Sequence, residues 1–235
     1  MEILYEDKYL VLVNKPAGLI VQGTREKEKS LLHKLKSYLK SRDKKEGEVF
    51  LAVVHRLDKP VSGALVLAKR SKTASKLFKI IQGREFDKIY LAKVEGKMRE
   101  PYGIWEDTTE DEKRAITFFY LLRASLEASW CLLYPLTGRK HQLRKALSKR
   151  GHPIIGDLRY GSKIKVEGGK AILLHSLFLG FPHPHREERL EIIAPIPYYF
   201  GNLSLDKKEI LEFLNKVKTE KERFSYVSGQ NLGQG

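Results

Sequence analysis

The chain has 235 residues, of which 42% are hydrophobic, so it can bury the core of one large or two small domains. Lysine and arginine outnumber aspartate and glutamate by 44 to 29, a formal net charge of +15, and residues beyond 204 add only six basic and five acidic side chains. A folded body this basic favours a polyanionic partner, nucleic acid first and an anionic membrane surface second. A soluble protein whose molecules simply repel one another could have the same composition.

Several classes of protein are excluded by what the sequence lacks. No apolar run is long enough to span a bilayer, and Met1 is not followed by the basic and hydrophobic regions of a secretory signal. Cys131 is the only cysteine, which excludes an intramolecular disulfide and fits a reducing compartment. We therefore expect a cytoplasmic protein that binds no membrane, with a monomer as the default.

The first half of the chain reads as short strands and two amphipathic helices. Its predicted elements are, in chain order, a hairpin over 3–13 that ends at the breaker cluster 14–18, a Ser30-capped helix to about Lys40, a charged loop over 42–48, buried strands at 50–54 and 64–68, and a Ser71-capped helix that ends at Gly83.

Strands dominate the second half. Its predicted elements are a strand over 86–94, an irregular acidic loop over 106–112 facing away from any RNA, strands over 114–124 and 127–136, a basic helix from the cap Thr137 to Gly151, strands over 171–181 and 189–193, a helix over 204–218 and a frayed end at 229–235. Because strands and helices do not alternate strictly, the pattern predicts an α+β fold. We expect residues 1–200 to form the catalytic domain, with the helix and tail of 201–235 packed on it or extending from it.

The segment between the strands at 50–54 and 64–68 is the candidate for chemistry. It contains Asp58, flanked by Arg56 and Lys59, in a turn set by Pro60 and Gly63. Nearby positive charge favours the ionised carboxylate, which can act as a covalent nucleophile or a general base. Taken alone, the same residues equally describe a solvated ion pair of little energetic value.

Three segments together resemble the RluA-type pseudouridine synthase family. They are His55-Arg-Leu-Asp-Lys-Pro-Val-Ser-Gly63, Lys88-Ile-Tyr-Leu-Ala92 with Val94-Glu-Gly96, and Thr137-Gly-Arg-Lys-His-Gln-Leu-Arg144 running into Gly151-His-Pro-Ile-Ile-Gly-Asp157. The segments 11–18 and 173–184 fit as well, so that the resemblance covers about residues 2 to 200. Each segment alone is a weak signal, but their order and spacing are specific.

The resemblance implies an isomerase that converts specific uridines of ribosomal or transfer RNA to pseudouridine, by cleaving the N-glycosidic bond, turning the base and rejoining it through carbon. It implies a mixed, largely antiparallel sheet flanked by helices and loops around a central active-site cleft, and no metal or organic cofactor. Asp58 matches the essential aspartate, Arg144 the arginine that pairs with it, and Tyr90 the tyrosine that packs against the base and assists a proton transfer. Arg56 matches the residue that fills the space of the flipped base.

The chemistry of these residue types agrees with the implied roles. Extruding a base costs a few kcal/mol, and a planar guanidinium such as that of Arg56 can stack where the base had been. An aromatic face such as Tyr90 can hold the extruded ring, and Arg144 can orient Asp58. Without the family pattern, Tyr90 reads as an ordinary strand aromatic and Arg144 as a solvated helix residue. Whether Asp58 attacks ribose or base, or removes a sugar proton, stays open.

Further RNA contacts are expected from basic and histidine side chains near these segments. The predicted contacts are Arg56, His55, Arg139, Lys140, His141 and Lys145. The segment Thr137-Gly138 could hold a phosphate or could simply cap a helix. The histidines lack acidic or sulfur companions at coordinating spacing, so no metal site is predicted.

Departures from the family pattern limit what can be carried over. Lys59 and Val61 stand where the family usually has Arg and Thr, and Ala146 replaces a common His. We expect no small N-terminal RNA-binding module, so that target choice would rest on the body, the basic helix or the last helix.

An RNA-binding or ribosome-assembly protein that keeps the fold with little or no catalysis is the alternative function. A protein of anionic membranes fits worst, because the basic residues are not gathered on one long amphipathic helix.

Overall fold

The computed structural model describes residues 2–23 and 30–228, and side chains as far as residue 222. The predicted frayed end at 229–235 lies outside these residues. Within the described ranges, no helix has both the length and the apolar composition needed to cross a membrane.

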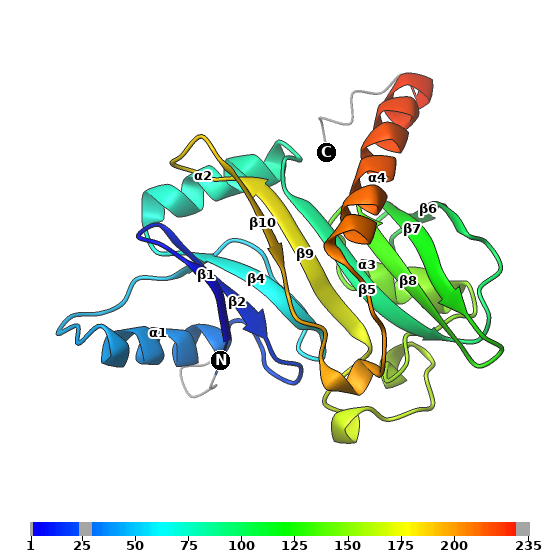
Figure 1. The fold of residues 1–235 in the computed structure, drawn as a ribbon, viewed down its shortest axis with the longest axis horizontal. Helices are drawn as coiled ribbons and strands as arrows, with labels where there is room; N and C mark the ends of the chain where they lie inside the picture. Colours follow the sequence, from blue (N-terminus) through cyan, green and yellow to red (C-terminus); the bar gives the residue numbers. More distant parts are fainter. Residues whose placement is uncertain (1, 24–29, 229–235) are drawn as a thin grey trace.

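A ten-stranded sheet forms the body of the protein (Figure 1). Along its main path the strands are β1 (Glu2–Glu6), β2 (Leu10–Lys15), β4 (Ser62–Ala68), β9 (Leu174–Pro182), β5 (Asp87–Glu95), β8 (Ala128–Pro135), β7 (Arg114–Ala124) and β6 (Tyr102–Thr108). The short β3 (Ala52–Val53) pairs with β4, and β10 (Arg189–Ile193) pairs with β9. Apart from β4 with β9, the paired strands are antiparallel. The predicted α+β fold with a mixed, largely antiparallel sheet is confirmed.

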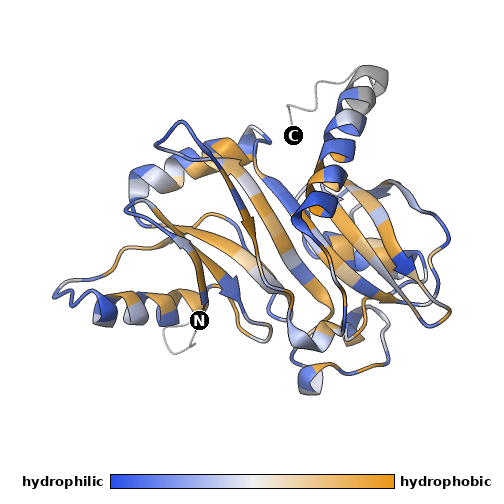
Figure 2. Ribbon diagram, viewed as in Figure 1, coloured by the Kyte–Doolittle hydropathy of each residue, from blue (hydrophilic) through white to orange (hydrophobic). Residues whose placement is uncertain are grey.

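Helices α1 (Leu31–Arg42) and α2 (Ser71–Gln82) cover opposite faces of the β2–β4 pair. Successive strand side chains point to opposite faces, so Val11 and Leu65 meet α1 while Leu12 and Val66 meet α2. Figure 2 shows the apolar residues concentrated along the central strands, between these helices. The apolar runs that predicted these strands therefore supply a buried face to each of the two helices.

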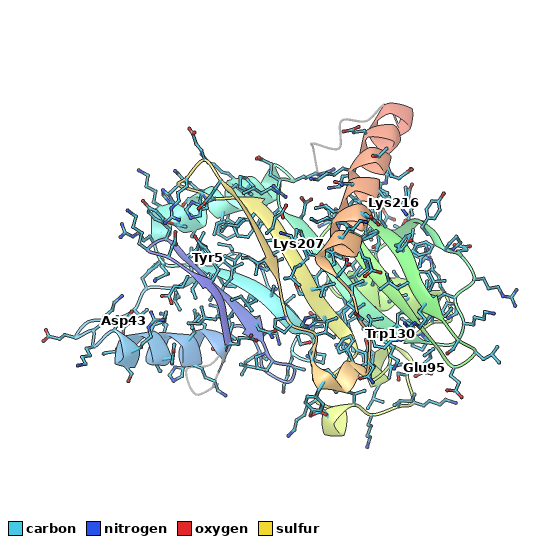
Figure 3. The ribbon with its side chains drawn as sticks, viewed as in Figure 1. Tyr5, Asp43, Glu95, Trp130, Lys207 and Lys216 are labelled. Carbon is cyan, nitrogen blue, oxygen red and sulfur yellow. The ribbon has the colours of Figure 1, made fainter. Side chains whose placement is uncertain are left out.

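The C-terminal helix α4 (Lys207–Ser228) packs on the same body (Figure 1). Asp206 and Glu209 form a reciprocal cap at its start, so it begins three residues later than predicted and runs ten residues further. The ammonium group of Lys216, labelled in Figure 3, lies 4.5 Å from the centre of the Tyr120 ring on β7. Lys221 donates a 2.5 Å hydrogen bond to the Tyr134 hydroxyl on β8. Our division of the chain at residue 200 stays a prediction.

The acidic loop predicted over 106–112 is wrong in its first part, because β6 continues to Thr108. Trp105 is buried and stacks on Phe119 of β7, with ring centres 4.3 Å apart. Asp107 pairs with Lys149 at 3.0 Å and with Arg150 at 2.9 Å. Asp107 therefore pairs with basic side chains at the end of the basic helix. The residues around 106–112 give no local signal of this contact.

Two of the three predicted helix caps are also wrong. Ser30 caps α1 as expected, accepting from the His33 N–H, but Ser71 lies inside α2, after Arg70. Helix α3 (Gln142–Lys149) begins five residues after Thr137, whose hydroxyl instead accepts from the Ile116 N–H and donates to Gln142 Oε1. Thr137 thus ties the loop before α3 to β7.

The strand predicted over 50–54 is only the two-residue β3, since Phe50 is half exposed and makes no strand pairing. The strand predicted from 171 begins at Leu174. The short helices η1 (Leu158–Tyr160), η2 (Glu167–Gly169) and η3 (Tyr198–Phe200) complete the connections.

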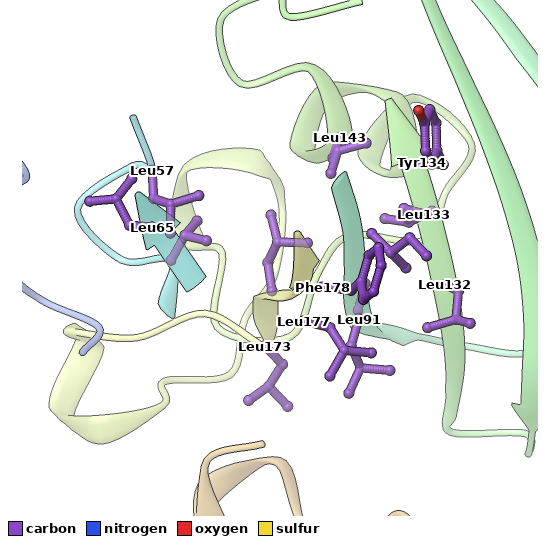
Figure 4. Packing of buried hydrophobic residues seen from close by; sticks show 14 of the residues in the cluster. Leu57, Leu65, Leu91, Leu132, Leu133, Tyr134, Leu143, Leu173, Leu177 and Phe178 are labelled. Carbon is purple, nitrogen blue, oxygen red and sulfur yellow. The ribbon is translucent and has the colours of Figure 1, made fainter. Parts of the chain in front are cut away.

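A short parallel junction between β4 and β9 holds the turn that contains Asp58. Gly63 has φ +115°, and a Cβ there would lie 2.3 Å from the carbonyl oxygen of Ser176. Ser62 Oγ and His175 Nδ1 are 2.9 Å apart, and the Ser176 hydroxyl donates to the Ala64 carbonyl. Leu57 of the turn is buried in the same cluster as Leu65 and Leu173, labelled in Figure 4. Only glycine allows this approach of the two strands, which fixes the base of the turn.

Candidate active site

An open cleft of about 740 Å³ lies where the turn 55–61, the start of β5 and the segment 137–144 meet. Asp58, Tyr90 and Arg144 all line it. Residues far apart in the sequence thus come together as the family pattern implied.

Arg144 holds Asp58 from the first turns of α3. Its Nη1 donates a 3.0 Å hydrogen bond to Asp58 Oδ2, across 86 residues of sequence. Arg144 is 5% exposed, whereas the Asp58 side chain keeps a third of its surface exposed to the cleft. The reading of Arg144 as a solvated helix residue is therefore wrong, because its guanidinium is buried and paired.

A second carboxylate, that of Asp157, accepts hydrogen bonds from the other two guanidinium nitrogens of Arg144. Arg144 Nε and Nη2 donate to its two oxygens at 2.6 and 2.8 Å, a bidentate pair. Burial alone would lower the pKa of Arg144, but the hydrogen bonds and charges of Asp157 and Asp58 outweigh it and raise the pKa. Asp157 is 1% exposed, and its position in a breaker-rich loop gave no local signal of this role.

Tyr90 lies on β5 directly opposite Ser176 of β9 and lines the cleft. Burial raises the pKa of its phenol well above the ordinary value, and the negative charge of Asp58 adds to the shift, while a hydrogen bond with Ser176 opposes it. The phenol is therefore neutral near pH 7 and can donate a proton or hydrogen bond to a group in the cleft.

Lys15 is a fully buried lysine beneath the turn, and sequence reasoning missed it. Its ammonium group donates to the carbonyl oxygens of Pro16, Leu19 and Lys59 at 3.0, 2.7 and 3.3 Å. Burial lowers the pKa of Lys15 to about 7, and the charge of Asp58 opposes the shift. The breaker cluster 14–18 predicted only a turn here, whereas its lysine ties that turn to the backbone beside Asp58.

The predicted RNA contacts occupy three kinds of position. Arg56 and Lys140 are exposed and line the cleft, and Arg139 lines it while its Nε donates to the Arg114 carbonyl at 3.0 Å. His141 lines the cleft beside Asp58. Lys145 pairs with Glu110 at 2.8 Å and does not line the cleft.

His55 lines the inner part of the cleft and braces the turn. Its Nε2 accepts a 3.1 Å hydrogen bond from the Val66 N–H of β4, and its ring lies 5.2 Å from that of Phe86. The imidazole therefore holds the turn against the sheet. Its predicted contact with RNA stays a prediction.

Two buried histidines are expected to make the protein less stable below about pH 6.5. Burial lowers the pKa of His55 to about 3 and that of His175 to about 4, so each stays neutral in the folded protein while the unfolded chain takes up a proton. Each should therefore remove about 1.4 kcal/mol of unfolding free energy between pH 7.5 and 5.5, about 3 kcal/mol together. Because Lys15 stays charged in the unfolded chain while burial lowers its folded-state pKa to about 7, it adds about 1 kcal/mol to the loss over the same interval, so the expected net loss is about 4 kcal/mol. Urea unfolding at the two pH values measures the loss.

The matched control for this pH dependence is His55→Gln, which keeps an acceptor for the Val66 N–H but cannot take up a proton. Between pH 7.5 and 5.5 its unfolding free energy should lose about 1.4 kcal/mol less than that of the unaltered protein, since one of the two histidines is gone. An unchanged dependence on pH would show that His55 does not contribute.

Fold and site together place an arginine-paired carboxylate in a cleft lined by basic side chains, and comparison with known proteins gives the class of protein. Residues 9–149 match the family model described as RNA pseudouridylate synthase. The chain is 31% identical over 226 residues to ribosomal large subunit pseudouridine synthase C of Buchnera aphidicola, covering 85% of this chain and 68% of that one. It is 32% identical over 231 residues to tRNA pseudouridine synthase C of Pasteurella multocida, covering 83% and 91%.

A solved structure agrees with these matches. Human RNA pseudouridylate synthase domain containing 4 superposes with a TM-score of 0.72 at 26% identity, over 85% of this chain and 90% of that one. The chain belongs to the RNA pseudouridylate synthase family, as the RluA-type resemblance indicated. It is an isomerase that converts uridine in RNA to pseudouridine.

Proposed function

We propose that this enzyme modifies uridines of ribosomal or transfer RNA, with Asp58 as the reacting group. The observation that carries the proposal is the placement of the Asp58 carboxylate inside a basic cleft, held by the buried Arg144 at 3.0 Å. Similarity to one enzyme named for the large ribosomal subunit and another named for tRNA supports these two substrate classes.

The proposed roles follow from where each side chain lies. A flipped uridine enters the cleft, where Tyr90 packs against the base and supplies a hydrogen-bond donor that stays protonated near pH 7. Arg144 orients Asp58 for its step, whether that is attack on ribose or base or removal of a sugar proton. Exposed Arg56 at the rim fills the space left in the RNA stack.

Backbone contacts are assigned to the basic side chains around the cleft. Arg139 and Lys140 line it and can reach phosphates of a bound RNA. His141 lines it beside Asp58, so its predicted contact with RNA would be made from within the cleft. Lys145 lies outside the cleft. An RNA phosphate there would compete with Glu110 for the Lys145 ammonium group. The proposal includes a cytoplasmic monomer, where the buried Cys131 thiol stays reduced and both RNA classes occur.

The test is to incubate the purified protein with unmodified transcripts of large-subunit ribosomal RNA and of a tRNA pool. Pseudouridine is then located by carbodiimide-adduct stops in reverse transcription, and one class of transcript should acquire stops at discrete uridines. Transcripts incubated without protein are the control. Binding of RNA without any such stop in either class would favour the alternative, an RNA-binding or ribosome-assembly protein that keeps the fold.

Mapping pseudouridines in cells with and without the protein would then identify the position. A site present only with the protein, and acquired by the same transcript in vitro, would establish the target.

A further inference from the structure

His141 and Tyr160 form a hydrogen-bonded pair beside Asp58, and the roles proposed above leave this pairing unexplained. Nδ1 of His141 lies 2.7 Å from the Tyr160 hydroxyl. The other ring nitrogen, Nε2, lies 3.7 Å from Asp58 Oδ2. Tyr160 does not line the cleft, whereas His141 does. The hydroxyl of the tyrosine therefore reaches Asp58 through the histidine, whereas its ring contacts Arg144.

The backbone holds His141 in this position. His141 precedes α3 with φ 55°, a left-handed conformation that few residues other than glycine adopt. Tyr160 is held from the other side, because its carbonyl oxygen accepts a 2.6 Å hydrogen bond from the Ser148 hydroxyl. Its ring lies 4.9 Å from the Arg144 guanidinium. Both partners are thus fixed by α3, the helix that also carries Arg144.

The surroundings keep the imidazole neutral. Burial lowers the pKa of His141, and the cationic Arg144, Arg159 and Lys140 add to the shift while Asp58 opposes it. A neutral imidazole has one N–H and one acceptor nitrogen. Its two tautomers therefore place different groups opposite the carboxylate.

Only one tautomer suits both neighbours. With the proton on Nδ1, the imidazole would donate to Tyr160 and turn the Nε2 lone pair toward the Asp58 carboxylate. With the proton on Nε2, the Tyr160 hydroxyl donates to Nδ1 and the N–H points to the carboxylate. The second arrangement gives the hydroxyl an acceptor and the carboxylate a donor.

Arg144 and His141 approach the same carboxylate oxygen of Asp58. Arg144 Nη1 and His141 Nε2 both approach Oδ2. Among the residues that the structure describes, no hydrogen-bond partner of Asp58 Oδ1 is found. We infer that Tyr160 is a positioning residue that fixes His141 as a donor to Asp58 Oδ2, so that Oδ1 is the oxygen left for the uridine.

This inference rests on the proposed role of Asp58 as the reacting group. The 3.7 Å separation is too long for a hydrogen bond, and the contact closes when the RNA orders the cleft, as hydrogen bonds of active sites commonly tighten on substrate binding. His141 then orients the carboxylate and does not itself exchange a proton with the substrate.

The first test reads the tautomer directly, without any turnover. Protein labelled with ¹⁵N in its imidazoles is examined by long-range ¹H–¹⁵N NMR, and the His141 signals are identified by their loss in His141→Gln. We expect a protonated Nε2 and an unprotonated Nδ1 in the unaltered protein, and a mixture of tautomers in Tyr160→Phe. A proton on Nδ1 in the unaltered protein would overturn the inference, whatever the activity of the enzyme.

The second test separates positioning from general structure by kinetics. Tyr160→Phe keeps the ring beside Arg144 and removes only the hydroxyl, so kcat should fall about 10- to 100-fold with KM for RNA unchanged. His141→Gln keeps an amide donor near the Nε2 position, so adding Tyr160→Phe to it should lower kcat less than about twofold. Tyr102→Phe, at an exposed tyrosine outside the cleft, is the matched control.

An equal loss from Tyr160→Phe in both backgrounds would assign Tyr160 a structural role and refute the coupling through His141. Failure of the proposed function would look different, because the unaltered protein would then form no pseudouridine in any transcript.

Discussion

Replacing Asp58 by asparagine is expected to abolish pseudouridine formation while leaving RNA affinity nearly unchanged. The amide has the same size but is a far weaker nucleophile and base, so the rate should fall at least about 10⁴-fold. The fold should survive, because Arg144 keeps its bidentate pair with Asp157. The measurements are single-turnover pseudouridine formation and the Kd for the same transcript.

The matched control for this prediction is Asp111→Asn, which removes an exposed carboxylate outside the cleft and should leave the rate unchanged. Activity of Asp58→Asn within tenfold of the unaltered enzyme would rule out Asp58 as the reacting group. Loss of RNA binding and activity together would instead indicate a role in building the cleft.

Replacing Arg144 by lysine should destabilise the protein and inactivate it, although the charge is kept. An ammonium group cannot make the bidentate pair with Asp157 and also reach Asp58, so a buried carboxylate loses its partner. Breaking a buried ion pair in this way costs about 3–5 kcal/mol. Urea unfolding near pH 7 measures the loss, provided the slope of the transition is unchanged.

A double variant tests whether the unpaired charge of Asp157 causes the loss of stability. Arg144→Met with Asp157→Asn removes both buried charges, so it should recover part of the stability that Arg144→Met alone loses, without recovering activity. If Arg144→Lys unfolded at the same urea concentration as the unaltered protein, the pair with Asp157 would contribute nothing to stability.

Sequence reasoning predicted the elements that carry a strong local apolar pattern. The continuous apolar runs of β2 and β4 and the helical spacing in α1 and α2 are such signals, and both strands are buried on two faces as a continuous run indicates. The strand β6 escaped prediction because its acidic side chains are balanced by partners elsewhere in the fold, Asp107 by Lys149 and Arg150 and Glu106 by Arg114. Local patterns carry no information about such partners.

Some residues of the candidate site were predicted from the sequence and others were missed. Asp58, Tyr90 and Arg144 were brought together by the family resemblance, and their geometry agrees with it. Lys15 and Asp157 were missed, because nothing in a local pattern tells which carbonyl oxygens or which guanidinium a side chain will meet after folding.

The departures at Lys59 and Val61 leave the turn intact for a physical reason. Lys59 contributes its backbone carbonyl, which accepts from Lys15 and from the Gly18 N–H at 2.8 Å, and its exposed side chain is not needed for that. Val61 is 2% exposed and fills the core beneath the turn.

The place of β9 in the sheet has a consequence for how the protein is made. This strand lies between β4 and β5, yet its residues 174–182 are translated long after both neighbours. A growing chain on the ribosome must therefore carry β4 and β5 without their shared partner until this late segment emerges from the exit tunnel. Arg144 and Asp157 emerge before it, but the junction at Gly63 and Ser176 cannot close until β9 is available, so the turn that contains Asp58 lacks its anchor until then.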